Sequence, residues 1–211
     1  MKTTIFIIFS LFITTNCLYA QADSLQNTNL LNDLLINESG NEELLPSKIL
    51  FTQKILWGNK GLMRNFNRFE LNPENRQNEL KLRRNILKTH QVMGFVTLGG
   101  MIAQGIVGAK LYDGDYAIKE THEALGAGVN IAYFTTASLA LFAPPKMVNE
   151  RKGFSSIKLH KALAIIHLSS MIATNVLAGQ IEKNPDLRPY HRAAAYTAFG
   201  SFAVSIFVIK I

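Results

Sequence analysis

Thr89-His90-Gln91-Val92 opens the first of four apolar segments in residues 89–211, and the other three also open with a histidine: Thr121-His122-Glu123-Ala124, Leu159-His160-Lys161-Ala162 and Tyr190-His191-Arg192-Ala193. Roughly 18 to 21 mostly apolar residues follow each histidine, the length that a helix needs to cross a hydrocarbon layer about 30 Å thick. The sequence therefore predicts an all-α membrane protein built as a four-helix transmembrane bundle. Because consecutive spans alternate in direction, we expect His90 and His160 at one membrane face and His122 and His191 at the other.

A small residue lies one helical turn after each histidine. Positions i and i+4 share a helix face, and these positions hold Gly94, Gly126, Ala164 and Ala195. Four small residues beneath four histidines would leave room for a flat, bulky group such as a porphyrin. The alternative is close helix packing, since membrane helices commonly approach each other through Gly and Ala.

Composition supports a membrane protein with a polar N-terminal part. The chain of 211 residues is 48% hydrophobic, and its apolar residues are concentrated in the first twenty positions and after His90. The formal charge of +7 does not indicate a nucleic-acid partner, because the basic residues lie in loops and before the first span, without interleaved aromatic residues. Cys17 is the only cysteine, so any haem would be bound non-covalently.

The N-terminus has the layout of a secretory signal. Lys2 precedes a short apolar run, and cleavage is expected after Ala20, which would remove Cys17 and leave residues 1–20 as the signal peptide. An uncleaved signal anchor is the alternative. Residues 21–46 are acidic and are expected to form a flexible leader.

Residues 47–88 form a basic juxtamembrane segment that we expect to be helical and that could contact a protein partner. Ser47 is a candidate N-cap for a short helix over Lys48–Trp57, which Gly58 would end. This helix would lie at the membrane surface or pack on the end of the bundle. Asn72-Pro73 predicts the start of a second helix that continues into the first span.

Turn-forming residues separate the spans. They are Asp113-Gly114-Asp115, Pro144-Pro145, Gly153 with Ser155 or Ser156, and Asn184-Pro185-Asp186 with Pro189.

Two signals disagree about membrane orientation. A cleaved signal peptide places residues from Gln21 onward, including His90 and His160, outside the cytoplasm. The positive-inside rule opposes this, because many basic residues would then lie outside: Lys81, Arg83, Arg84, Lys88, Lys146, Arg151, Lys152, Lys158 and Lys161. The signal peptide is a discrete feature that is read early in export, so we give it more weight than the positive-inside rule. We therefore expect an integral multi-pass protein in the lipid bilayer of a bacterial-type inner membrane, with its N-terminal segment extracytoplasmic.

The histidines are the candidate ligands. Neutral imidazole binds iron, and polar residues within membrane spans are costly enough to mark function. A single histidine at a helix end is more often an interfacial residue. The joint pattern of same-side partners on alternate helices favours cofactor ligation.

The chain resembles the cytochrome b561 family over roughly residues 89–211. Thr89-His90-Gln91-Val92-Met93 is similar to that family's His-Pro-Val-Met opening, Lys158-Leu159-His160 to its Ser-Leu-His segment, and Pro189-Tyr190-His191 to its Pro-Trp-His segment. The resemblance implies a haem-binding domain over 89–211 with two b-type haems, ligated by His90 with His160 and by His122 with His191. It also implies electron transfer across the membrane between a donor and an acceptor that the sequence does not identify.

The chain departs from the family at both ends of the core. The usual leading helix is replaced by the signal-like segment, the trailing helix is missing, and no equivalent of the ascorbate-binding motifs is present. No nucleophile, acid–base pair or nucleotide-binding loop stands out, so substrate chemistry is expected at a partner or at a haem edge. The alternatives are a haem-binding anchor for a soluble oxidoreductase that exchanges electrons with quinone, and a haem-free membrane scaffold.

Other polar residues within the spans receive a structural interpretation. His167 lies on the face of His160, about 10 Å deeper, and we interpret it as a hydrogen-bonding core residue rather than an alternative ligand or proton relay. Gln104, Asn130, Asn175 and Gln180 are expected to bond neighbouring helices rather than haem propionates.

Overall fold

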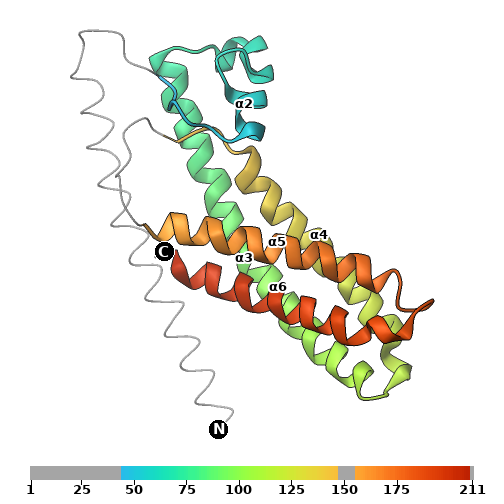
Figure 1. Cartoon of the computed structure of the whole chain (residues 1–211). Helices are drawn as coiled ribbons and strands as arrows, with labels where there is room; N and C mark the ends of the chain where they lie inside the picture. The colour runs from blue at the N-terminus through green and yellow to red at the C-terminus, as the bar shows by residue number, and fades with distance from the viewer. Residues whose placement is uncertain (1–43, 147–154, 210–211) are drawn as a thin grey trace. The chain divides into compact units, whose positions relative to one another are not determined.

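The computed structural model describes residues 44–146 and 155–209, and every regular element within these ranges is a helix (Figure 1). The elements are α2 (Phe51–Trp57), η1 (Leu62–Asn65), η2 (Asn67–Phe69), α3 (Pro73–Tyr112), η3 (Tyr116–Ile118), α4 (Lys119–Phe142), α5 (Ser156–Ala178), η4 (Pro185–Leu187) and α6 (Arg188–Val208). The all-α prediction is confirmed for this part of the chain. The predicted signal peptide, the leader up to residue 43 and the Gly153 turn lie outside the described residues.

Most helix ends agree with the local signals in the sequence. The Asn72 side chain accepts a hydrogen bond from the Asn75 amide at 2.8 Å, and Pro73 occupies the first turn of α3. This helix runs without a break for 40 residues, about 60 Å, so the juxtamembrane helix does continue into the first span. Gly114 has a φ of 105° in the next turn, a conformation that favours glycine. Ser155 caps α5 through the Lys158 amide.

The start of α2 differs from the prediction. Ser47 caps no helix; α2 begins at Phe51, after Leu50 in an extended conformation. The residues before it are held in place by tertiary contacts, because Leu45 is buried and the Leu44 carbonyl accepts a hydrogen bond from Arg76. These contacts outweigh the weak local preference of Ser47 for capping.

The long helices form two antiparallel hairpins, α3 with α4 and α5 with α6, and α3 also packs against α6 (Figure 1). A short connection makes consecutive helices antiparallel neighbours, and here residues 113–118 and 179–187 connect the helices of each hairpin. The hairpins share a core whose buried members come from all four helices: Met101, Val129, Tyr133, Met171, Ala198 and Phe202.

Within residues 44–146 and 155–209, three helical stretches are long and apolar enough to cross a membrane: Pro73–Tyr112, Tyr116–Phe142 and Ser156–Ala178. Small and polar residues, with Arg188 and Arg192 near its start, give α6 a less apolar composition. The coarse prediction of an all-helical protein with membrane-crossing helices is therefore supported, and the fourth span stays a prediction.

The outer surface of the hairpins is apolar. Large side chains on all four helices are exposed, among them Val92, Phe95, Val96, Ile102, Ile106, Ile131, Ile165, Ile172, Val176 and Phe207. Water-soluble monomers rarely expose apolar surface on this scale, so these side chains suit contact with lipid.

The N-terminal module, residues 44–72, packs on the end of α4 rather than standing free. The indole Nε1 of Trp57 donates to the Phe142 carbonyl at 2.9 Å, and the Thr52 hydroxyl donates to the Leu141 carbonyl at 2.7 Å. The predicted packing of α2 on the bundle end is confirmed, and its position at a membrane surface stays a prediction. The last carbonyls of α4, which have no partners within the helix, are thereby satisfied.

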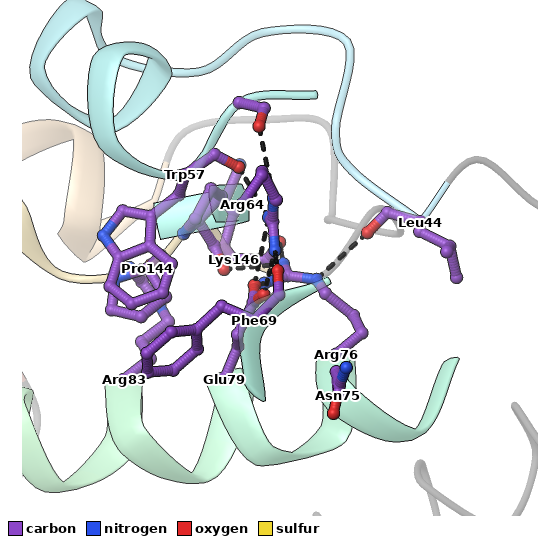
Figure 2. Close-up of polar contacts among 12 residues, drawn as sticks. Leu44, Trp57, Arg64, Phe69, Asn75, Arg76, Glu79, Arg83, Pro144 and Lys146 are labelled. Atoms are coloured by element: carbon purple, nitrogen blue, oxygen red, sulfur yellow. Dashed lines mark hydrogen bonds and ion pairs between the residues drawn. The ribbon is translucent and has the colours of Figure 1, made fainter. Parts of the chain in front are cut away.

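A buried ionic cluster fixes this module to α3 (Figure 2). Arg64 and Arg76 both donate to the Glu79 carboxylate, which is completely buried. Arg64 also donates to the carbonyls of Trp57 and Phe69, and Arg76 donates to those of Pro145 and Lys146. The cluster therefore links the module, α3 and the segment after α4.

Two histidine pairs as the candidate functional site

The structure brings the four predicted histidines together as two pairs. The ring centres of His90 on α3 and His160 on α5 lie 6.2 Å apart, and those of His122 on α4 and His191 on α6 lie 6.5 Å apart. Each pair joins one helix of the first hairpin to one helix of the second. All four side chains are half-buried.

The separation within each pair matches that of two imidazoles sharing one metal. A metal–nitrogen bond of about 2.0–2.1 Å on each side, with each ring centre about 1.1 Å behind its nitrogen, separates the two centres by about 6.3 Å. The observed ring-centre distances of 6.2 and 6.5 Å are close to this estimate. The two ring planes are inclined by 86° in the first pair and by 74° in the second.

Three of the histidines are oriented by a backbone carbonyl of the neighbouring helix in the same hairpin. The Nδ1 atoms of His90, His160 and His191 lie 2.8, 2.9 and 3.0 Å from the carbonyl oxygens of Thr136, Ser205 and Thr174, respectively. A carbonyl can only accept, so each Nδ1 carries the proton and each Nε2 keeps a free lone pair. This arrangement fixes ring orientation and tautomer in metal-binding histidines generally.

These contacts repeat with a constant spacing. On α4, α5 and α6, the residue that contacts the neighbouring histidine comes 14 residues after the helix's own histidine: His122 precedes Thr136, His160 precedes Thr174, and His191 precedes Ser205. On α3 the same spacing leads from His90 to Gln104, which contacts His122. Fourteen residues are about 3.9 helical turns and about 21 Å, so both residues lie near one face, and the two pairs are about 21 Å apart along the helices.

His122 is the exception to the carbonyl pattern, because it is contacted by a side chain. The Gln104 amide nitrogen lies 3.2 Å from Nδ1 and 3.3 Å from Nε2 of the His122 ring. It also donates to the His122 carbonyl at 3.0 Å. Gly108 lies against the same ring: a Cβ atom there would be 2.9 Å from the ring Cε1.

The four small residues differ in how much space they leave. Gly94 is buried, yet a Cβ atom there would meet no atom within 4 Å, so open space lies beside it one turn below His90. At Gly126 a Cβ atom would lie 3.0 Å from the Gln104 amide nitrogen, which occupies the equivalent space. Ala164 and Ala195 are half-buried. The His90–His160 site is thus more open than the His122–His191 site.

His167 belongs to neither pair. Its Nδ1 atom lies 2.6 Å from the hydroxyl of Tyr133, and its ring packs edge-on against Tyr133 and Phe202. The interpretation of His167 as a hydrogen-bonding core residue agrees with these contacts. Likewise Asn130 and Asn175 bond each other at 2.8 Å and link α4 to α5, as expected for helix-bridging residues.

Within residues 44–146 and 155–209, no group of three or more His, Cys, Asp or Glu side chains is arranged to hold a metal ion. Each candidate site therefore offers two protein ligands. A bare ion usually takes more ligands than this from a protein.

Sequence reasoning missed the groups that orient the histidines. Three are backbone carbonyls, whose position does not depend on the side chain of Thr136, Thr174 or Ser205. No residue type in the sequence could have indicated them, because every residue carries a backbone carbonyl. Gly108 was also missed; its signal was a small residue facing His122 across the short turn after α3.

Comparison with known proteins identified no relative: no protein-family model, curated protein or solved structure matches this chain.

Proposed function

We propose that this protein is a transmembrane electron-transfer cytochrome that holds two non-covalent b-type haems, one between His90 and His160 and one between His122 and His191. In this proposal α6 is the fourth transmembrane helix. Its 21 residues are about 31 Å long, and it packs along α5, which is itself long and apolar enough to span. The proposal agrees with the resemblance of residues 89–211 to the cytochrome b561 family.

The observation that carries the proposal is the geometry of the pairs. Two imidazoles face each other at 6.2 Å in one place and at 6.5 Å in another, and in three of the four the Nε2 atom is left free by an Nδ1 contact to a carbonyl. The two hairpins also share one register, because in each of them the two contacts lie 14 residues apart on both helices.

Haem iron with two imidazole ligands would supply one-electron redox chemistry. The residues of this chain have three tasks toward it. The histidines would hold it through their ring nitrogens, the carbonyls of Thr136, Thr174 and Ser205 keep three of the rings in the right tautomer, and no side chain fills the space beside Gly94. The buried side chains of Tyr133, His167 and Phe202 pack against one another in the core of the bundle.

The test is the haem content of the chain after gentle detergent extraction. We expect two haems per chain and reduced-minus-oxidised bands of b type. One haem per chain would restrict the proposal to one pair, and a featureless spectrum of protein supplied with haem during expression would overturn it.

The alternatives are separated by further results of the same preparation. A flavin or iron–sulfur subunit that co-purifies with the haem protein would favour a membrane anchor for a soluble oxidoreductase, with residues 47–88 as the contact. A stable, correctly folded protein without haem would favour the scaffold. Soluble donors and acceptors can then be screened by reduction and reoxidation of the bands.

A further inference from the structure

The four histidine contacts are equivalent in position but not in chemistry. At three of them the contacting group is a backbone carbonyl, which is fixed by the helix and can only accept. At the fourth it is the side-chain amide of Gln104, which has both a donor and an acceptor and can rotate. The His122–His191 site therefore differs from the other by one mobile group.

The orientation of that amide is set by the His122 carbonyl, because only the NH2 group of Gln104 can donate to it. The second N–H of this group can donate to only one ring nitrogen of His122, because a neutral imidazole has a single acceptor, and Nδ1 at 3.2 Å is slightly closer than Nε2 at 3.3 Å. The amide oxygen Oε1 of Gln104 is buried and has no hydrogen-bond partner, in contrast to the other buried side-chain polar atoms of the described residues. Buried polar atoms without a partner are rare and call for an explanation.

We propose that Gln104 is the positioning residue of His122 and that its amide turns over when the cofactor enters. A His122 ring that binds iron through Nε2 must carry its proton on Nδ1, and this proton needs an acceptor. The unpaired Oε1 of Gln104 becomes that acceptor once the amide rotates. The rotation places Oε1 where the amide nitrogen now lies, so the hydrogen bond to the His122 carbonyl is lost while the space beside Gly126 stays occupied.

Two consequences follow, and they rest on the function proposed above. The His90–His160 site needs no such rearrangement, so it fills first, and the His122–His191 site fills second and more weakly. The acceptor for the His122 ring N–H is a side chain, so a substitution can change how strong an acceptor it is without altering the helix. The three backbone carbonyls cannot be changed in this way.

The first test uses the haem-free protein, so that it does not depend on the proposed function. In protein labelled with 15N-histidine, nitrogen chemical shifts report the tautomer of each ring. We expect His90, His160 and His191 to carry the proton on Nδ1 and His122 to carry it on Nε2, with the His122 signals alone moved by Gln104→Leu. A His122 ring that already carries its proton on Nδ1, or that ignores Gln104→Leu, would overturn the inference.

The second test is haem titration of the same variants. Gln104→Leu removes the acceptor at similar volume and should weaken haem binding at the His122–His191 site by about 10- to 100-fold, leaving the His90–His160 site unchanged. Gln104→Glu keeps an acceptor and should restore occupancy with a lower midpoint potential at that site. Thr197→Val, which removes an exposed hydroxyl that bonds only within α6, serves as the control and should leave both affinities as they are.

The outcomes separate the two ideas. If wild-type protein takes up no haem, the proposed function fails while the tautomer measurement still decides the role of Gln104. If haem binds and Gln104→Leu fills both sites with unchanged affinity, potential and spectrum, the proposed function stands and the inference about Gln104 is wrong.

Discussion

His90 and His160 come from two different helical hairpins, and their ring centres lie 6.2 Å apart. Each ring takes its orientation from a backbone carbonyl of its own hairpin. The carbonyl of Thr136 orients the first ring and the carbonyl of Ser205 orients the second. A ligand between them would therefore join the two hairpins. His122 and His191 are arranged in the same way, apart from the contact with Gln104.

Substitution of the four histidines should give only two phenotypes. His90→Ala and His160→Ala should each remove the same spectral component, and His122→Ala and His191→Ala should each remove the other, because iron that loses one axial imidazole is held weakly and changes its spectrum. A double substitution within a pair should add little to a single one, whereas a double across pairs should remove both components. His167→Ala should leave both haems bound, and loss of a component in that variant would show that the ligand on α5 has been misassigned.

Filling the space beside Gly94 should block one site. Gly94→Ala should be tolerated, because its Cβ atom would meet nothing within 4 Å, while Gly94→Leu should fill the space and abolish haem binding at the His90–His160 site. Gly200→Leu is the matched control, since a Cβ atom at Gly200 also meets nothing but this residue is exposed on the outer surface. Haem stoichiometry measures the effect, and two haems in Gly94→Leu would contradict the assignment of this space to the cofactor.

Gly108→Ala should affect the other site. The new Cβ atom would lie 2.9 Å from Cε1 of His122, so the ring must shift by a few tenths of an ångström. We expect haem affinity at the His122–His191 site to fall about 10-fold, as for changes in groups that orient a ligand. Gly105→Ala, where a Cβ atom meets nothing within 4 Å, is the control, and equal behaviour of the two variants would rule out a close contact between Gly108 and the ring.

Glu79→Gln should release the N-terminal module from the bundle. The substitution leaves Arg64 and Arg76 buried without their carboxylate partner, a change that costs about 3–5 kcal/mol in comparable buried pairs. Trp57 is the only tryptophan of the chain and is 4% exposed, so its fluorescence reports on the docking of the module directly. We expect a red shift of the emission and faster proteolysis within residues 44–72. Glu74→Gln, at an exposed position of the same helix, should leave the emission unchanged, and an unshifted spectrum in Glu79→Gln would mean that the cluster does not hold the module.

The sequence predicted those parts of the structure that depend on local signals or on periodicity. The capping residues Asn72 and Ser155 and the turn residue Gly114 affect only the backbone a few residues away. The helix ends beside them could therefore be predicted from the sequence. The alternation of spans was sufficient to group His90 with His160 and His122 with His191 on common sides, and the structure brings these residues together. The predicted start of α2 was wrong because a tertiary contact, the burial of Leu45, determines where this helix begins.

The remaining features depend on contacts between distant segments. Arg64 and Glu79 look like ordinary solvated charges in the sequence, and only the fold buries them together. The carbonyl contacts of three histidines could not be predicted from residue type, because every residue has a backbone carbonyl. Gln104 was noted in the sequence as a residue bonding a neighbouring helix, but its contact with His122 required the register of α3 against α4.

Several of the features described above lie on the single unbroken helix α3, so the distances between them along the helix depend on the number of residues that separate them. It carries Glu79 of the ionic cluster, His90 of one pair, and Gln104 and Gly108 beside the other. Adding one residue between His90 and Gln104 would turn the far end by about 100° and advance it by about 1.5 Å, so one site could be kept in register only by losing the other. The distance between the two pairs therefore depends on the number of residues between His90 and Gln104, so an insertion or deletion there should disturb both sites even where exposed side chains such as Val92 can be exchanged.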